Sequence, residues 1–572
     1  MKKKAFMLLG LLATVSLTSC RITYVSSKTV TAPVYSLFNK EVDNSRTISF
    51  EVLSEKELLP YLTVTSYLSL YDGYLKDGYK FELHEDSSDA VVLVDDPDGN
   101  TIYYVDFSPT YKSVMVNGDF SSAFVFDKDY SKSSLYALSD TKYEIAKEPT
   151  TLRTFSYSNL GFNTLRKGGV NYYPLSLLEC AFAPYSNVHH LYNYSRIVQY
   201  SEYEELTDTT YKVDGEDLTA FKEMKRYITN HLQVMPLYLR EDRRASFLFT
   251  LENQYGLKFT RNISSMRAYL QKQDFYDDFL SENNEKRNEA YYKTFALLDD
   301  GHTSIRDHAD FAWMEGEFNQ YGSKMSHIIS VRQTLSNQRT LAPGEVYYST
   351  DEKLAFFTFD SFTFAENAYQ EDGTTLKTDL SDYHSENYDT FFYFIRLLKE
   401  IKTKGGVEDV VIDISTNGGG VLGVMMELIT LLAKGNSSDI YIETDLTGLV
   451  QKMTTKVDAD NNGVFNDFDV FGNDFKFYIL TSEFSFSCGN AFPFFLKKNN
   501  IATIIGQKSG GGECAVSESY LPSGEHYYHS GHIHIGWYEE GLFEGDEPGV
   551  EVDKIVNYED FYNLDKLQTL IK

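Results

Sequence analysis

Positive charge and long apolar runs are both scarce in this sequence. Its 572 residues include 53 Lys and Arg against 83 Asp and Glu, which gives a formal net charge of −30. This surplus of negative charge disfavours contact with nucleic-acid phosphates, so we expect no nucleic-acid partner. Beyond the N-terminal segment, no run approaches the ~18 uninterrupted apolar residues that a membrane-spanning helix needs. We therefore expect no membrane-spanning helix in the rest of the chain.

Cysteine is scarce as well, with four in the whole chain. Cys180 has no evident partner, whereas Cys488 and Cys514 flank one predicted helix–strand unit. Outside the cell such a pair could form a disulfide, but sequence spacing cannot establish the required geometry. We expect two small buried thiols and keep the disulfide as the alternative.

Residues 1–20 have the pattern of a targeting segment. Three lysines at positions 2–4 precede an apolar stretch over residues 5–17, which is too short for a stable membrane span. The end of the segment, Leu17-Thr18-Ser19-Cys20, resembles a bacterial lipobox. This resemblance implies a lipoprotein signal peptide, lipidation of Cys20 and an extracytoplasmic protein anchored to the bacterial membrane, at the cell surface or in the periplasm. Residues 21–44 are predicted to be a polar tether.

The remaining chain has the composition of a globular protein with more than one core. Hydrophobic residues make up 42% and aromatic residues 15%, which argues against disorder, and the length predicts two to four domains. Residues 45–210 are predicted to be a strand-rich accessory region. Two stretches within it, 59–64 and 173–178, each lead from an extended run through proline into a short helix. They resemble repeats of copper-amine-oxidase-N-terminal-like modules; generic α+β structure is the alternative.

Two changes of periodicity divide the rest of the chain. Residues 215–303 have apolar positions at helical spacing, for example from Leu218 to Ile228, and end in Asp299-Asp300-Gly301-His302-Thr303. Residues 304–350 are a connecting region, too short for a full PDZ domain. Residues 351–572 alternate strands and helices, which predicts an α/β core.

One stretch of this core suggests nucleophilic chemistry. A strand over residues 475–480 is followed by Ser487 at the start of a predicted helix, and a second strand covers 501–505. The first-turn N–H groups of a helix lack intrahelical partners, and its dipole favours developing negative charge. Ser487 is therefore a candidate nucleophile; a simple helix-capping role is the alternative.

A serine hydroxyl also needs a base, a group that orients the base, and donors for the oxyanion. His302 stands where a predicted helix ends. The run Gly418-Gly419-Gly420 follows a predicted strand over 407–414, where bare backbone amides can approach a substrate. A carboxylate-rich turn at 543–550 contains Glu544 and Glu547.

In this order, the motifs resemble the tail-specific (C-terminal-processing) serine protease family over roughly residues 215–560. The matching segments are 300–303, 412–420, 485–490, 506–511 and 544–550. Many members use a Ser–Lys dyad, but Gly512 stands where that lysine would be, and Lys508 is four residues early. The chain is thus similar to the tricorn-core and retinoid-binding-protein-like branch, which uses a histidine base.

The resemblance implies a ClpP/crotonase-like catalytic core preceded by the helical segment and a strand-rich α+β region. It implies Ser487 as nucleophile, His302 as base and Glu544 as orienting carboxylate, with Glu547 as the alternative. The Gly419 and Cys488 amides would be the oxyanion donors, and the substrate-binding residues would be Asn417, Gly418 and Gly420. We expect a serine endopeptidase that acts on peptides or proteins and needs no cofactor for catalysis. The alternative is a catalytically inactive lipoprotein that binds peptides or cell wall. The sequence does not indicate an oligomeric state.

A separate motif between residues 458 and 469 fits a calcium loop of the EF-hand or dockerin type. Oxygen-bearing side chains recur at Asp458, Asp460, Asn462 and Asp469, with glycine at the sixth position for the sharp turn. A polar surface hairpin is the alternative.

His529, His532 and His534 raise the question of a zinc site. The last two lie on one face of a strand, but no acidic or cysteine partner is evident at a suitable spacing. We expect a strand surface or a wall of the substrate cleft.

Overall fold

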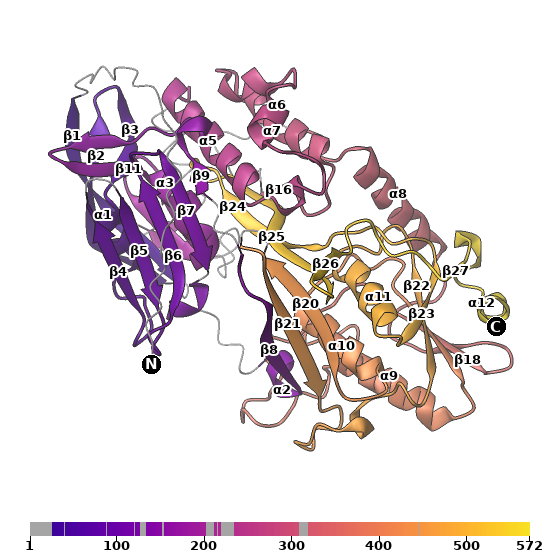
Figure 1. Ribbon diagram of the computed structural model, residues 1–572. Helices are drawn as coiled ribbons and strands as arrows, with labels where there is room; N and C mark the ends of the chain where they lie inside the picture. Colours follow the sequence, from indigo (N-terminus) through magenta and orange to yellow (C-terminus); the bar gives the residue numbers. More distant parts are fainter. Residues whose placement is uncertain are drawn as a thin grey trace.

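A computed structural model describes most of the chain (Figure 1). The residues it describes are 26–38, 41–86, 89–118, 120–125, 133–150, 154–201, 211–213, 216–218, 234–307, 318–444 and 447–572. The predicted signal peptide, Cys20 and most of the helix predicted from Leu218 to Ile228 lie outside these ranges. Within the described part of the chain, no helix has the length and apolar character needed to cross a membrane.

Two antiparallel-rich sheets form the N-terminal half (indigo and purple in Figure 1). The first has the strand order β10 (Leu165–Lys167), β11 (Val170–Pro174), β3 (Lys56–Leu62), β2 (Glu41–Leu53), β1 (Ser27–Phe38), β13 (Ile197–Ser201) and β12 (Val188–Tyr192). The second has the order β4 (Lys80–Glu85), β5 (Ala90–Asp95), β6 (Thr101–Ser108), β7 (Ser113–Gly118) and β9 (Thr154–Ser156). The described part of residues 45–201 is therefore rich in strands, but the predicted tether is wrong from Ser27 onward. β1 pairs with β2 along its length, and its second half is buried.

The two proline-containing stretches do lead from strand to helix. β3 is followed by α1 (Val64–Leu68), and β11 is followed by α3 (Leu175–Ser186). The two strands also pair with each other, Tyr173 opposite Leu62. The strand-to-helix order is confirmed; the resemblance to a known module stays a prediction.

Helices α5 (Leu237–Asn253), α6 (Met266–Leu270) and α7 (Asn284–Leu298) follow, in agreement with the predicted helical segment. Their apolar side chains share one hydrophobic core with the N-terminal sheets, so this segment is not an independent domain. The described part of the connecting region contains β16 (Ser304–Asp307), α8 (Ser323–Gln338) and β17 (Tyr347–Tyr348).

The C-terminal core is built on a six-stranded sheet in the order β17, β18 (Leu354–Thr358), β19 (Asp409–Asp413), β22 (Lys476–Thr481), β23 (Ala502–Gly506) and β27 (Lys554–Ile555). From β18 onward all neighbours are parallel. Helices α9 (Thr390–Lys404), α10 (Leu422–Leu432), α11 (Cys488–Lys498) and α12 (Leu564–Ile571) accompany it. A parallel sheet covered by helices needs apolar strands, and β18 and β19 are fully buried. The mixed α/β prediction is confirmed.

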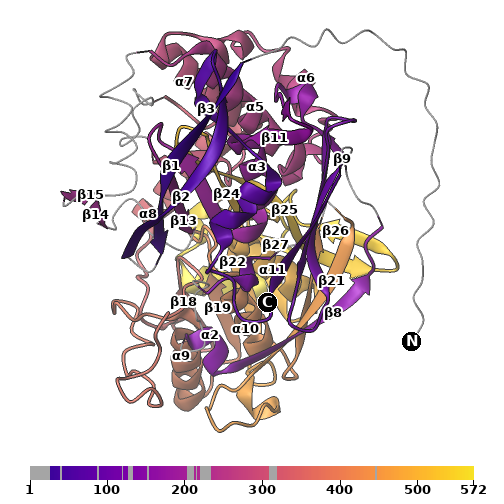
Figure 2. The same cartoon turned by 90° about the vertical axis from the view of Figure 1, so that its left-hand side faces the viewer.

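A seven-stranded sheet joins the two halves of the molecule. Its path is β16, β25 (His526–Glu539), β20 (Ser438–Thr444), β21 (Leu449–Val457) and β8 (Ser139–Lys147), and β25 also pairs with β24 (Cys514–Tyr520) and β26 (Leu542–Gly545). β8 comes from the predicted accessory region but lies beside β21 of the core (Figure 2). The predicted boundary at residue 210 is therefore wrong for β8, because long-range strand pairing leaves no local signal.

The three cysteines in the described ranges are Cys180, Cys488 and Cys514, and all are free and buried. The prediction of buried thiols is therefore confirmed.

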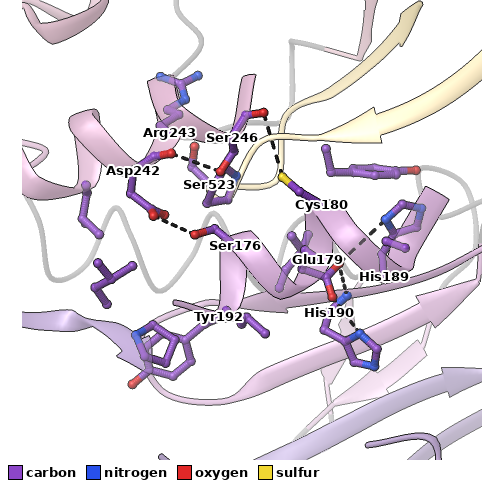
Figure 3. Close-up of a pocket in the computed structure, with 18 of the residues that line it drawn as sticks. Ser176, Glu179, Cys180, His189, His190, Tyr192, Asp242, Arg243, Ser246 and Ser523 are labelled. Atoms are coloured by element: carbon purple, nitrogen blue, oxygen red, sulfur yellow. Dashed lines mark hydrogen bonds and ion pairs between the residues drawn. The ribbon is translucent and has the colours of Figure 1, made fainter. Parts of the chain in front are cut away.

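A cavity of about 60 Å³ lies among α3, β12 and α5 in the N-terminal half (Figure 3). Ser176 donates to the Asp242 carboxyl at 2.6 Å, and burial raises the pKa of Asp242 to about 7. Across the cavity, Glu179 lies 2.8 Å from Nδ1 of His190.

Candidate active site

Ser487 occupies a strained turn between β22 and α11. Its backbone angles are φ 57° and ψ −128°, a region that side-chain-bearing residues rarely adopt. Although Ser487 is the N-cap residue of α11, its hydroxyl makes no capping hydrogen bond. The side chain is partly exposed. Helix capping therefore does not explain why a serine stands here, because its hydroxyl does not bond to the helix N–H groups.

The glycine loop after β19 packs directly on this turn. Gly419 has φ +111°, and a Cβ atom added there would lie 2.7 Å from the Ser487 Cβ. No side chain fits at this distance, so glycine is required at Gly419 for the close approach. The Gly419 N–H donates to the Asn417 side chain at 2.8 Å. Within the described residues, the Cys488 N–H donates to no protein group.

Asn417 has a different position from the one that the resemblance implies. Its side chain is fully buried; Oδ1 accepts from Gly419, and Nδ2 donates to the Phe359 carbonyl at 3.3 Å. Asn417 therefore holds the loop in shape and does not face a substrate. Gly418 and Gly420 are exposed, so their backbone can be reached from solvent.

The loop after β23 closes the other side of the turn. The Ser487 N–H donates to the Gly511 carbonyl at 2.9 Å. At Gly512, where a dyad lysine would stand, an added Cβ would lie 2.8 Å from the Phe486 ring and 2.9 Å from the Ser487 nitrogen. Lys508 binds Glu551 at 2.6 Å and is turned away, as predicted. The turn thus has no room for a lysine at position 512.

His302 reaches the same region from the end of α7. Asp299 closes this helix with a left-handed conformation, and His302 follows, with 8% of its surface exposed. Its imidazole packs against Phe486, the neighbour of Ser487, with 4.8 Å between ring centroids. Burial lowers the pKa of His302, and the negative charge of Asp300 partly opposes this effect. The imidazole is therefore neutral at neutral pH, the form that a general base requires.

The contact stops short of a catalytic hydrogen bond. Within the described residues, no hydrogen bond joins the His302 imidazole to the Ser487 hydroxyl, and the buried Nδ1 atom of His302 has no partner. The structure therefore brings the two loops together through Phe486 and leaves the two reactive groups unpaired.

Glu544 is not at this site. Its carboxylate binds Lys498 at 2.6 Å, and Lys498 is the last residue of α11. An 11-residue helix is about 16 Å long, so this carboxylate lies at the opposite end of α11 from Ser487. Glu547 is closer to the turn: its Oε2 accepts from the Gly512 N–H at 3.0 Å, and burial raises its pKa to about 7.

Asp300 is the carboxylate whose charge acts on His302, and sequence reasoning gave it no role. Its Oδ1 accepts from the His302 backbone N–H at 3.1 Å, and its Oδ2 accepts from Thr303 and Ser530. In the sequence, the one feature that could have indicated a role for Asp300 is its position two residues before His302. Ser530 lies on β25, a contact that only the fold reveals.

The predicted calcium loop brings its carboxylates together. The carboxylate oxygens of Asp458, Asp460 and Asp469 lie within 4.8 Å of one another. Asn462 directs its Oδ1 to the Val464 N–H at 2.8 Å. The loop follows β21 and ends in the short 3₁₀ helix Asp467–Asp469. The next strand, β22, belongs to another sheet, so the loop does not join the two strands of a hairpin.

The histidines on β25 are not a strand surface. His529 and His534 are buried, and His532 is partly buried. The fold also supplies the partners that the sequence did not reveal, because Glu513 and Cys514 contact His534.

The strain at Ser487 leads to a stability prediction. Ser487→Gly removes the Cβ atom that makes the backbone angles at this position unfavourable, whereas Ser487→Ala keeps that atom. We expect the glycine variant to be more stable than the alanine variant by about 1 kcal/mol, since such strain is on the order of 1–3 kcal/mol and glycine loses part of it to backbone entropy. Urea unfolding of the two variants measures the difference. An alanine variant at least as stable as the glycine variant would show that the turn is unstrained.

Comparison with known proteins gives one family match. The family model described as Peptidase family S41 matches residues 375–532. No curated protein matches the chain. A putative peptidase from Parabacteroides merdae is 15% identical, with 54% of this chain and 86% of that chain covered and a TM-score of 0.35. A lipoprotein from Streptococcus agalactiae is 12% identical, with 59% of this chain and 98% of that chain covered and a TM-score of 0.34.

A photosystem II D1 C-terminal processing protease is also 12% identical, with 58% of this chain and 96% of that chain covered and a TM-score of 0.34. Because these structural likenesses are distant, the similarity to a family rests on the family model alone. The matched segment contains the glycine loop and Ser487, although not His302. Residues 375–532 are therefore similar to peptidase family S41.

Proposed function

We propose that the chain is a serine endopeptidase that hydrolyses peptide bonds through an acyl-enzyme, on a ClpP/crotonase-like core of the histidine-base branch. One observation carries the proposal. The Ser487 hydroxyl stands free in a strained turn at the start of α11, with the Cys488 N–H behind it and the Gly419 loop in contact. A strained turn that presents a hydroxyl to the N-terminal end of a helix is suited to nucleophilic attack.

In this mechanism, Ser487 attacks the carbonyl carbon of the scissile peptide while His302 takes the hydroxyl proton. The Cys488 N–H is the oxyanion donor that the geometry supports best, since the Gly419 N–H is held by Asn417. His302 then gives its proton to the departing amine, and a water molecule hydrolyses the acyl-enzyme. Because Ser487 and His302 are not hydrogen-bonded without substrate, the imidazole has to move onto the hydroxyl in the complex.

Glu544 was predicted to orient the histidine base, but the carboxylate that acts on His302 is the buried Asp300. Its charge favours the protonated imidazole that forms during attack. Glu547 has a separate role, because its Oε2 holds the Gly512 N–H next to the turn.

Single substitutions at the two reactive groups test the peptidase proposal. We expect Ser487→Ala and His302→Ala each to abolish hydrolysis of an unfolded protein substrate, because one removes the nucleophile and the other the base. Gel-based proteolysis measures the loss, and circular dichroism checks that each variant is folded. Lys508→Ala, whose side chain is turned away, is the matched control and should keep full activity. Normal turnover in either active-site variant would refute the assignment.

The unpaired state of Ser487 and His302 also favours the second candidate, an inactive lipoprotein that binds peptides or cell wall. A fluorophosphonate probe separates the two candidates. It labels an activated serine, so a binding protein would remain unlabelled at Ser487.

We propose that the protein acts on the outer face of a bacterial membrane, where lipidated Cys20 would hold it. The lipobox-like sequence supports this location. In cells that express the full chain, Cys20→Ala should move the protein from the membrane fraction to the soluble fraction. Fractionation with a membrane-protein marker measures the change, and Cys180→Ala is the matched control. A Cys20→Ala protein that stays with the membrane would contradict the anchor.

We further propose that the 458–469 loop binds structural calcium. The three neighbouring carboxylates support this, since calcium is bound by oxygen ligands in loops of this spacing. Bound calcium would also offset the repulsion among these charges.

Calcium should raise the melting temperature of the protein. At a calcium concentration ten times Kd, the expected stabilisation is about 1.4 kcal/mol. Asp460→Asn should reduce the effect, whereas Asp98→Asn, an exposed residue of the N-terminal half, should leave it unchanged. Differential scanning calorimetry measures the shift, and an unchanged melting temperature at millimolar calcium would remove the proposal.

A further inference from the structure

Three side chains that commonly bind metals meet where β24 begins beside β25. Cys514 and His534 are opposite each other in the antiparallel ladder, and Glu513 immediately precedes β24. The Glu513 Oε1 atom lies 2.7 Å from the His534 Nδ1 atom, and the Cys514 Sγ atom lies 3.8 Å from that nitrogen. Since the three ligand atoms lie within 4.8 Å of one another, one ion could contact all of them.

The cluster is removed from solvent. Glu513 is 6% exposed, Cys514 1% and His534 8%. A Cβ atom added to Gly545 would lie 1.8 Å from the Glu513 Oε2 atom, so the segment after β26 passes directly over this carboxylate. The Glu547 N–H donates to the same oxygen at 3.0 Å. The backbone of Gly545 and Glu547 thus covers the Glu513 carboxylate and fixes its position.

Next to the cluster lies the buried carboxylate of Asp546. Asp546 stands between Gly545 and Glu547, which both contact Glu513, and is 3% exposed. Neither of its carboxylate oxygens has a hydrogen-bond partner among the described residues. A buried carboxylate in this state is destabilising unless it is neutralised or lies close to a cation. Burial raises the pKa of Asp546, so this carboxyl is stabilised either by its own proton or by a nearby cation.

We propose that Glu513, Cys514 and His534 bind a divalent transition-metal ion of the zinc class, with Asp546 supplying negative charge beside it. Zinc accepts oxygen, sulfur and nitrogen ligands in tetrahedral geometry, at about 2.0–2.3 Å. Tetrahedral ligands at these bond lengths are about 3.3–3.8 Å apart. The separation of Sγ and Nδ1 already fits, and that of Oε1 and Nδ1 must open by about 0.6 Å.

Binding of the ion is balanced by the loss of one proton. The Cys514 thiol releases its proton to solvent and binds as thiolate, while Glu513 binds as carboxylate. His534 binds through Nδ1 as neutral imidazole and keeps its proton on Nε2. The hydrogen-bond contact between Glu513 and His534 is replaced by two bonds to the ion.

The three proposed ligands do not include Ser487 or His302, but they lie next to the glycine loop that contacts Ser487. Gly511 and Gly512, which contact Ser487, directly precede Glu513. A bound ion would tie this loop to β25. The inference does not depend on the peptidase proposal, because metal binding is measured without substrate.

Cobalt titration of the full chain under reducing conditions tests this site, since Co²⁺ commonly substitutes for Zn²⁺ and reports its thiolate ligands. After removal of metals with a chelator, we expect one Co²⁺ per chain to give a thiolate-to-cobalt charge-transfer band, which Zn²⁺ should abolish. Cys514→Ser should eliminate the band. His534→Gln should weaken Co²⁺ binding about 100-fold or more, because loss of an outer-sphere partner alone weakens binding 10–100-fold.

Two matched variants serve as controls. Cys180→Ser removes another buried thiol, and His532→Gln removes a neighbouring imidazole on β25; both should keep the band and the affinity. Absence of the band in the folded protein, or an equal band in Cys514→Ser, would overturn the proposal. If Cys514→Ser does not fold by circular dichroism, His534→Gln decides by the same measurement, and unchanged affinity refutes the site. Binding at the 458–469 loop would give no such band, because that loop has no thiol.

Discussion

The candidate active site depends on backbone approaching backbone more closely than any side chain would allow. Ser487 is held between two glycine-containing loops, one at Gly419 and the other at Gly511 and Gly512. The parallel strands β19, β22 and β23 bring these loops to one edge of the sheet. Because the carboxyl ends of neighbouring parallel strands meet there, the register of three buried strands determines where the serine stands.

The electrostatics around this turn are unusual for a chain with so much negative charge. Asp300, Asp546 and Glu547 are all largely withdrawn from water near the two proposed reactive loops. Asp300 is stabilised by hydrogen bonds from Thr303 and Ser530, whereas Asp546 has no such donor in the described part of the chain. Asp300 can thus remain charged beside His302, whereas the Asp546 carboxyl needs a proton or a nearby cation.

Much of this arrangement could be predicted from local sequence. The apolar strands, the helix after Ser487 and the glycine loop each have a short-range pattern, so the sequence predicts the α/β core and the meeting of the loops around Ser487. Long-range strand pairing has no such pattern and could not be predicted. β1 consists of residues that read as a polar tether, and only its pairing with β2 buries part of it. Glu544 matched a motif, yet one ion pair with Lys498 places it at the wrong end of α11. Cys514 and His534 are twenty residues apart, and only the β24–β25 register makes them neighbours.

The position of β8 has a consequence for how the molecule can be divided. This strand belongs to the N-terminal half by sequence, but it completes a sheet of the C-terminal half by lying against β21. An unpaired β21 would present open N–H and C=O groups to other chains. The two halves are interleaved, and no single cut in the polypeptide separates them into two intact folding units.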